Sequence, residues 1–250
     1  MNSTIETMLN HRSIRKFKDL ELSNSQVEMI VKAAQSASTS SHVQAYSIIG
    51  VTDMAKKRKL AEIAKGQKYV EQNGHFFVFC ADLHRHEVIA DKREQKEVYG
   101  NLETAESFMV AVIDAALAAQ NAAVAAESMG LGICYIGGLR NDMEGVADLL
   151  GLPQRTAPLF GMAVGYPDQD PGRKPRLPAA AVYHENEYMK DREKTARLLD
   201  QYDREMQDYY IARTGGKRKD TWSGMMAGMF SEPKRTYIKS FLKRIGFPFN

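Results

Sequence analysis

The order of apolar and polar positions predicts short strands and amphipathic helices in the first 166 residues. Four apolar runs have strand composition: 46–51, 76–81, 131–136 and 158–166. Four segments repeat apolar residues with helical spacing: 3–10, 23–34, 53–64 and 142–150. Helices surrounding four short buried strands predict an α+β domain built on one central mixed or antiparallel sheet.

The longest periodic segment, 103–129, predicts the dominant helix, and its many alanines permit close packing against a neighbouring helix. Asp114 and two amides interrupt its apolar stretch, which argues against a membrane span. The N-terminus lacks the basic and apolar regions of a signal peptide. We therefore expect a cytoplasmic protein with no membrane partner.

The charge is distributed unevenly along the 250 residues. The net charge is +3, yet 201–250 holds ten Lys and Arg against five Asp and Glu, so the first 200 residues sum to −2. Such a skew points to an anionic partner. From 185 onward the pattern predicts polar helices, which we interpret as a helical extension (185–250) of a single domain covering 1–250.

The remaining composition excludes several classes. With 44% hydrophobic and 26% charged residues, the chain is neither disordered, collagen-like nor a disulfide scaffold. Its two cysteines, Cys80 and Cys134, lie in separate apolar runs, which favours two buried free thiols.

Three segments have the composition of an anion or ligand site. His11-Arg12-Ser13-Ile14-Arg15 combines guanidinium forks with a hydroxyl donor, which suits a phosphate, although a solvated basic turn explains it equally well. In 172–178, prolines restrict the backbone around Lys174 and Arg176. In 135–140, a strand runs into Gly137-Gly138, which either admits a ligand to the backbone or forms a tight turn.

Several catalytic motifs are absent from the sequence. Gly130-Leu131-Gly132 ends a helix and lacks the third small residue of a dinucleotide fingerprint, and no Walker, Gly-x-Ser-x-Gly or Cys-x-x-Cys motif occurs. His84, His86 and Glu87 match no strong zinc spacing, so we expect no metal. Because no nucleophile and base pair stands out, we expect no catalytic side chain and chemistry supplied by a cofactor.

These segments, taken together, resemble a known family. The five motifs are 11–15, the Ser-rich run leading to Gln44, Gly66-Gln67, 135–141 and 174–178, in that order. Their order and spacing are similar to those of the flavin-dependent nitroreductase superfamily. The detail, including 218–223, resembles the branch of oxygen-insensitive NADPH nitroreductase A and NADPH-flavin oxidoreductases. The resemblance covers essentially the whole chain.

The resemblance implies a nitroreductase-like fold and an FMN-binding homodimer whose active sites lie at the subunit interface, with the 185–250 extension wrapping the dimer and contributing to nucleotide binding. It implies these FMN contacts: His11, Arg12, Ser13, Arg15, Ser40, Gln44, Gln67, Tyr135, Ile136, Gly137, Gly138, Lys174 and Arg176. Arg213, with Arg235 as a weaker candidate, is implied to hold the NADPH 2′-phosphate.

The implied activity is NADPH oxidation by ping-pong two-electron transfer to small aromatic acceptors: nitroaromatics, quinones or free flavin. A fixed cation beside the N1 and O2 edge of the flavin would stabilise the reduced cofactor. His42-Val43 and 223–231 depart from the family pattern, which leaves the choice of acceptor open.

Two other functions stay open at this point. One is a nucleic-acid or anionic-surface binding module that uses the basic C-terminus and has no redox activity. The other is a flavin-free structural or regulatory member of the same fold. The retained cations at 12, 15, 174 and 176 disfavour that second alternative.

Overall fold

The computed structural model describes residues 2–249, which form two compact units. The first unit comprises 1–170 and 235–250, and the second comprises 171–234. The predicted 185–250 extension therefore contributes residues to both units.

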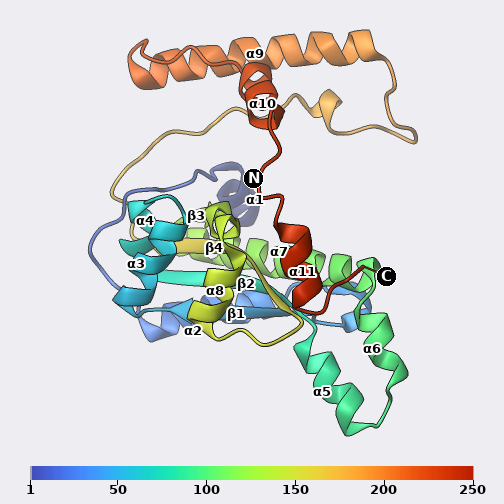
Figure 1. The fold of residues 1–250 in the computed structure, drawn as a ribbon. Coiled ribbons are helices and arrows are strands. Elements are labelled where there is room, and N and C mark those ends of the chain that lie inside the picture. The colour runs from blue at the N-terminus through green and yellow to red at the C-terminus, as the bar shows by residue number, and fades with distance from the viewer. Residues whose placement is uncertain (1, 250) are drawn as a thin grey trace. The chain divides into compact units, whose positions relative to one another are not determined.

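A four-stranded antiparallel sheet forms the centre of the first unit (Figure 1). Its strands, in spatial order, are β1 (Tyr46–Val51), β2 (His75–Asp82), β4 (Thr156–Gly165) and β3 (Gly132–Ile136). The two central strands are almost wholly buried, which explains why their sequences are continuously apolar instead of alternating. The predicted α+β class and all four predicted strands are confirmed, and the sheet is antiparallel.

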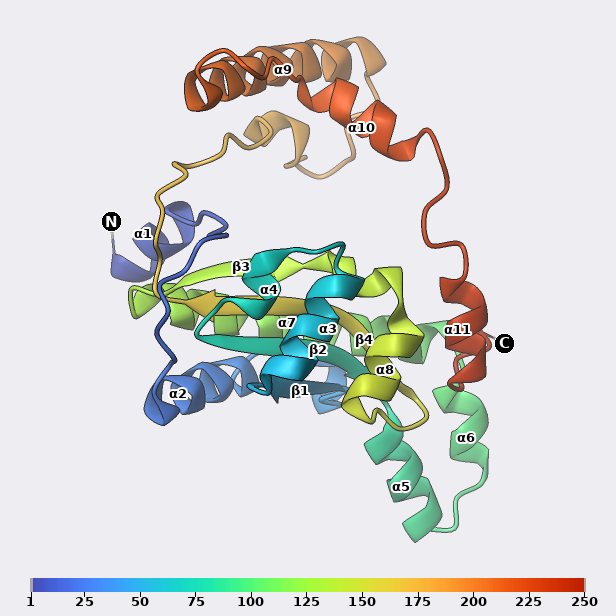
Figure 2. The same cartoon turned by 60° about the vertical axis from the view of Figure 1, so that its left-hand side comes forward.

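Helices cover both faces of the sheet (Figure 2). On one face lie α2 (Asn24–Gln35) and α7 (Ala105–Ser128), and α1 (Ser3–Leu9) contacts α7; on the other face lie α3 (Met54–Ile63), α4 (Lys68–Glu71) and α8 (Met143–Leu150). Alternate residues of β2 serve the two layers: Phe77 packs toward α7, and Phe76 packs toward α3. Side-chain caps fix several helix starts, among them a capping box at Ser23 and a cap by Asp53.

The long helix α7 is the core helix of this unit. By length and hydropathy it is the one helix among residues 2–249 that could cross a membrane, but eight of its residues are buried against the sheet and α2. Seven of the eight are alanines, which allow α2 to approach closely, and the eighth is Asp114. A buried carboxylate is typical of a helix inside a folded protein and not of one facing lipid.

Three helices were not predicted from the pattern: the one-turn α4 and the two helices that follow β2. The segment that contains His84, His86 and Glu87 begins α5 (His84–Lys92), and α6 (Glu97–Leu102) follows it. Each buries a single side chain, Ala90 and Leu102, so their sequences carry little apolar periodicity. The two helices extend away from the sheet as a pair (Figures 1 and 2).

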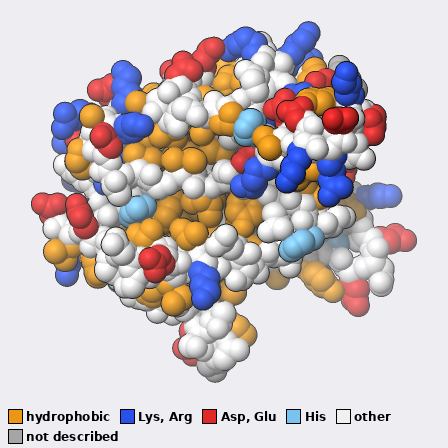
Figure 3. All heavy atoms as spheres, turned by 90° about the horizontal axis from the view of Figure 1, so that it is seen from below, with side chains coloured by type: hydrophobic (Ala, Val, Ile, Leu, Met, Phe, Trp, Pro, Cys, Tyr) orange, Lys and Arg blue, Asp and Glu red, His pale blue; other side chains and the backbone are white. Residues whose placement is uncertain are grey.

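Large apolar side chains remain exposed on several helices of the first unit. Met109, Ile113 and Leu117 form one stripe on α7, with exposed fractions of 55%, 44% and 43%. Figure 3 shows hydrophobic side chains gathered in bands across one face of the molecule. A contiguous exposed apolar face is typical of a binding surface.

The end of the chain returns to the first unit. The short helix α11 (Ile238–Arg244) buries Phe241 and Leu242, and Phe247 joins the same core. Phe108 of α7 packs against Phe247, with their ring centroids 4.9 Å apart. Phe241, Leu242 and Phe247 thus belong to the core of the sheet domain.

The second unit is helical. It contains α9 (Arg192–Thr214) and α10 (Trp222–Phe230). Its small core consists of three buried residues on α9 (Tyr202, Met206 and Tyr210), covered by Leu177 and Trp222. This confirms the prediction that strands end before 185 and polar helices follow.

Candidate functional site

The basic N-terminal segment is held against the edge of the sheet. Ser13 forms an isolated parallel bridge with Ile133 of β3, and the Ile14 N–H donates to the Ile133 carbonyl at 2.9 Å. Ile14 is buried against Gly132, where an added Cβ would lie 2.5 Å from the Ile14 Cγ1. Glycine at 132 therefore permits the close approach, and the extended backbone fixes Ser13 and Arg15 on either side of a buried anchor.

Arg15 differs from its charged neighbours in its lack of an acidic partner. Three neighbours are paired with carboxylates: His11 with Glu127 at 2.7 Å, Arg12 with Asp170 at 2.9 Å and Lys16 with Asp168 at 2.6 Å. Within residues 2–249, no carboxylate lies within 4.0 Å of the exposed Arg15 guanidinium. Its charge is therefore available to an external anion.

Arg15 and Ser13 converge with the start of α4. Burial raises the pKa values of Tyr69 and Cys134, and the nearby Arg15 guanidinium opposes both shifts. The Ser13 side chain also hydrogen-bonds Cys134. Gln67 precedes Tyr69 by two residues and is the N-cap of α4, yet its side chain forms no capping bond. The Arg15 guanidinium and the Ser13 hydroxyl thus lie together at this edge, beside Tyr69 of α4 and Cys134 of β3.

Successive residues of β3, the strand that leads to Gly137 and Gly138, pack on opposite faces of the sheet. Ile136 is buried on the α3 side, whereas Tyr135 lies on the α7 side with its ring edge-on to Phe160 at 5.6 Å. Gly137 and Gly138 begin a 3-10 helix (Gly137–Asn141) and do not form a tight turn. A Cβ at Gly138 would lie 3.1 Å from the Ala64 Cα, so packing on α3 already accounts for this glycine.

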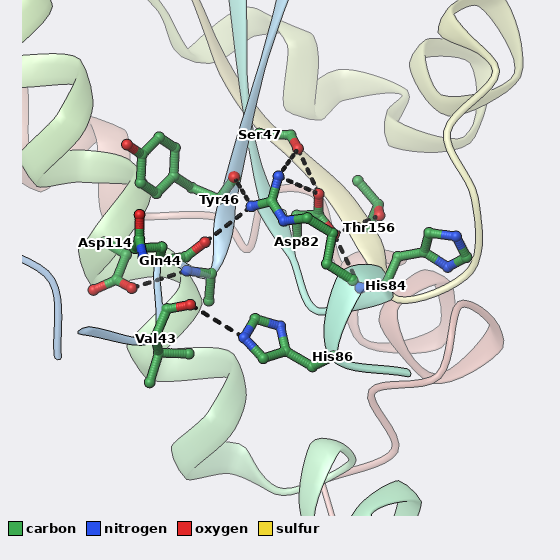
Figure 4. Close-up of polar contacts among 11 residues, drawn as sticks. Val43, Gln44, Tyr46, Ser47, Asp82, His84, His86, Asp114 and Thr156 are labelled. Carbon is green, nitrogen blue, oxygen red and sulfur yellow. Dashed lines mark hydrogen bonds and ion pairs between the residues drawn. The ribbon is translucent and has the colours of Figure 1, made fainter. Parts of the chain in front are cut away.

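Ser40 and Gln44 lie in the loop between α2 and β1. The loop contains a short 3-10 helix (Ser40–His42), and Gln44 lines a cavity of about 430 Å³ beside Arg85 and His86. Figure 4 shows that side chains from α5 and α7 contact the loop backbone. Asp114 and Arg85 were not among the predicted site residues, although Asp114 is a visible signal as the acid in the middle of an alanine-rich helix, between Glu106 and Glu127 at its two ends.

The second unit carries the other two cations assigned to FMN. The Lys174 ammonium lies 5.6 Å from the Tyr210 ring centroid, and Arg176 Nη1 donates to the Lys174 carbonyl at 3.0 Å. Between them, the Pro175 carbonyl accepts a 3.0 Å hydrogen bond from the Tyr202 hydroxyl. These contacts to α9 fix the loop, as its prolines predict.

The two candidate NADPH residues belong to different units. Arg213 lies in the last turn of α9, where its Nη1 donates to the Tyr209 hydroxyl at 3.0 Å. Arg235 belongs to the first unit, has a positive φ of 57° and donates to Asn141 Oδ1 at 3.1 Å. Neither has a carboxylate within 4.0 Å in the part of the chain that the structure describes.

Metal and thiol chemistry receive no support from the described residues. Across 2–249, no three His, Cys, Asp or Glu side chains are grouped to hold a metal ion. His84 contacts Glu87 at 3.4 Å, and the His86 ring contacts the Val43 carbonyl. Both cysteines are free and buried, as predicted, and burial raises the pKa of Cys80 to about 12, which leaves its thiol protonated and unreactive.

Comparison with known proteins matches both parts of the chain. The model of the nitroreductase family matches 8–166, and that of the nitroreductase family C-terminal domain matches 174–250. The FMN reductase (NADPH) of Bacillus subtilis (strain 168) is 53% identical over 99% of both chains. The oxygen-insensitive NADPH nitroreductase of Salmonella typhimurium (strain LT2) is 43% identical over 99% of both chains. The solved structure of B. megaterium NfrA1 shares 58% identity and a TM-score of 0.97, covering 98% of this chain and 99% of that one.

Proposed function

Because this chain belongs to the nitroreductase family, we propose that it is an FMN-dependent oxidoreductase that takes electrons from NADPH and reduces free flavin, nitroaromatics or quinones. The full-length similarity to an FMN reductase and to an NADPH nitroreductase supports this activity. The order of the reaction is ping-pong: NADP⁺ leaves before the acceptor binds.

The observation that carries the proposal is the unpaired Arg15 beside Ser13 on a backbone fixed to β3. These groups fit the FMN phosphate, because a guanidinium fork and a hydroxyl together present several donors to its oxygens. When bound, FMN supplies the two-electron chemistry, for which the described residues offer no nucleophile. Arg12 is neutralised by Asp170, so Arg15 is the stronger phosphate ligand.

The other implied FMN contacts divide by unit. In the first unit, His11, Ser40, Gln44, Gln67 and the backbone at 135–138 are assigned to the ring and ribityl chain. In the second, Lys174 and Arg176 are assigned to the phosphate or to the N1 and O2 edge. The Lys174 ammonium lies near the Tyr210 ring of α9, the Arg176 guanidinium donates to the Lys174 carbonyl, and neither has an acidic partner among the described residues. None of these FMN contacts requires a reactive side chain.

Arg213 is assigned to the NADPH 2′-phosphate. It is exposed, it is unpaired with any described carboxylate, and its Nη1 bond to Tyr209 holds the guanidinium in place. Arg235 is the weaker candidate, because its guanidinium is already engaged by Asn141 and is half-buried. In this assignment the basic C-terminal surplus recognises a dinucleotide and no nucleic acid; the comparisons give that alternative no support.

The protein functions as a cytoplasmic homodimer in this proposal, with the C-terminal extension taking part in dimer and nucleotide contacts. The exposed stripe of Met109, Ile113 and Leu117 supports a second copy as partner, because burying these side chains removes apolar surface from water. An Ile113→Glu variant should become monomeric in light scattering coupled to gel filtration, while Glu106→Gln on the same helix should not.

The proposed activity is tested by the flavin content of the purified protein. The expected result is a yellow preparation with FMN released on denaturation, and NADPH should bleach its visible absorbance. A colourless protein that binds no added FMN in a fluorescence titration contradicts the proposal.

A further inference from the structure

The carboxylate of Asp114 is fully buried in the middle of α7, where a charge requires strong hydrogen bonds. Its two oxygens each accept one backbone N–H: Oδ1 from Ser40 at 3.0 Å and Oδ2 from Ala45 at 3.0 Å. No Lys, Arg or His nitrogen lies within 4.0 Å of it in the described part of the chain. The negative charge of Asp114 is therefore stabilised by backbone N–H groups at the two ends of one loop, at Ser40 and Ala45.

The loop between those two N–H groups has a strained backbone. Ser41, His42 and Gln44 have φ values of 47°, 58° and 55°. A left-handed backbone conformation is unfavourable for a residue that has a side chain. Three such residues among four positions do not hold this conformation by themselves, so contacts outside the loop must stabilise it.

The opposite side of the loop is held from α5. Arg85 Nη2 donates to the Gln44 carbonyl at 2.9 Å and also to the Tyr46 carbonyl. His86 Nε2 lies 3.1 Å from the Val43 carbonyl, which it can only contact as a donor. Figure 4 shows the backbone between Asp114 on one side and the α5 side chains on the other. The Asp114 carboxylate thus accepts the N–H groups of the loop, and the Arg85 guanidinium and His86 ring donate to its carbonyls.

We propose that Asp114 and Arg85 are positioning residues that fix the Ser40–Gln44 loop in its flavin-binding conformation. This rests on the proposed function, in which the Ser40 and Gln44 side chains contact FMN. A carboxylate is needed at 114 because two N–H groups must each find an acceptor. Asparagine supplies one oxygen only and turns its own N–H toward the second donor.

The decisive substitution is Asp114→Asn, with Glu106→Gln as its matched control. Both exchange a carboxylate for an amide on α7, but Glu106 is exposed. In the FMN-free protein, Asp114→Asn should increase deuterium uptake in a peptide covering 39–46, while Glu106→Gln should leave it unchanged. Asp114→Asn should also raise the FMN Kd by up to about tenfold, because one charge-assisted hydrogen bond that holds the loop is lost, and it should alter the visible circular dichroism of bound FMN.

A second variant keeps the proposal testable if Asp114→Asn does not fold. Arg85→Gln removes the guanidinium that donates to the Gln44 and Tyr46 carbonyls, and because the Arg85 side chain is half exposed the fold should tolerate the change. Arg93→Gln at the end of α5 is its control. Arg85→Gln should raise both the deuterium uptake of the loop and the FMN Kd. Unchanged deuterium uptake or an unchanged FMN Kd in Arg85→Gln, or in a folded Asp114→Asn, overturns the proposal.

The two proposals fail in different ways. If wild-type protein binds no FMN, the proposed function is wrong, and the deuterium uptake of the FMN-free variants still decides whether Asp114 and Arg85 hold the loop. If wild-type protein binds FMN and the variants bind it equally well, the proposed function stands and the positioning role is wrong.

Discussion

Replacing Arg15 with alanine should release FMN while leaving the fold intact. The guanidinium is exposed, and no described carboxylate pairs with it, so its loss should change the free energy of unfolding by no more than about 0.5 kcal/mol. A charge-assisted hydrogen bond to phosphate contributes about 1.5–3 kcal/mol, which predicts a rise in the FMN Kd of roughly 10- to 150-fold.

The control for this prediction is Lys16→Ala. Lys16 is the adjacent cation and is also exposed, but Asp168 already pairs with it at 2.6 Å. Titration of FMN-free protein, followed by quenching of flavin fluorescence, should show a weakened Arg15→Ala and a Lys16→Ala close to wild type. Equal Kd values for Arg15→Ala and wild type would refute the assignment. Equal weakening by both variants would show that only the summed charge matters.

Three further predictions concern the nucleotide, the pH dependence and the packing at β3. Arg213→Ala should raise the KM for NADPH far more than that for NADH in steady-state assays, and equal effects would exclude a 2′-phosphate contact. Burial, with a smaller contribution from Lys57, lowers the pKa of His75 to about 4 from 6.5. The unfolded chain therefore binds this proton more readily than the folded protein does. As the pH falls from 6.5 to 4, the unfolding free energy should decrease by about 3 kcal/mol from this histidine alone. A His75→Phe variant should lack this part of the pH dependence. Gly132→Ala should lower the unfolding free energy by about 1–3 kcal/mol in urea, because its Cβ would meet Ile14, whereas Gly100→Ala, with open space around it, should not.

Much of the sheet domain was predictable because its signals are local. The four strands are apolar runs bounded by polar residues, and helix starts such as Ser23 and Asp53 carry their own capping side chains. Local patterns also explain why α5 and α6 were missed. Each buries only one side chain, so neither shows an apolar stripe.

The candidate site was predictable only in part. Proximity of Arg15 and Ser13 follows from their spacing on one extended segment, but the pairing of Arg12 and Lys16 with acids more than 150 residues away does not. Gly138 was selected as a possible ligand contact, while the structure explains it by packing on Ala64. Asp114 holds a loop about 70 residues earlier in the chain. Such long-range contacts leave no periodic signature.

The reductive half-reaction tests the central claim most directly. Wild-type protein loaded with FMN is mixed with NADPH under anaerobic conditions, with no acceptor present, and the visible flavin absorbance is followed by stopped flow. We predict complete bleaching with one NADPH per FMN, and recovery of the absorbance when a quinone or nitroaromatic is added afterwards. Reduction that occurs only when the acceptor is already present would contradict the ping-pong order, and no reduction under either condition would contradict the assignment as an NADPH-dependent flavin enzyme.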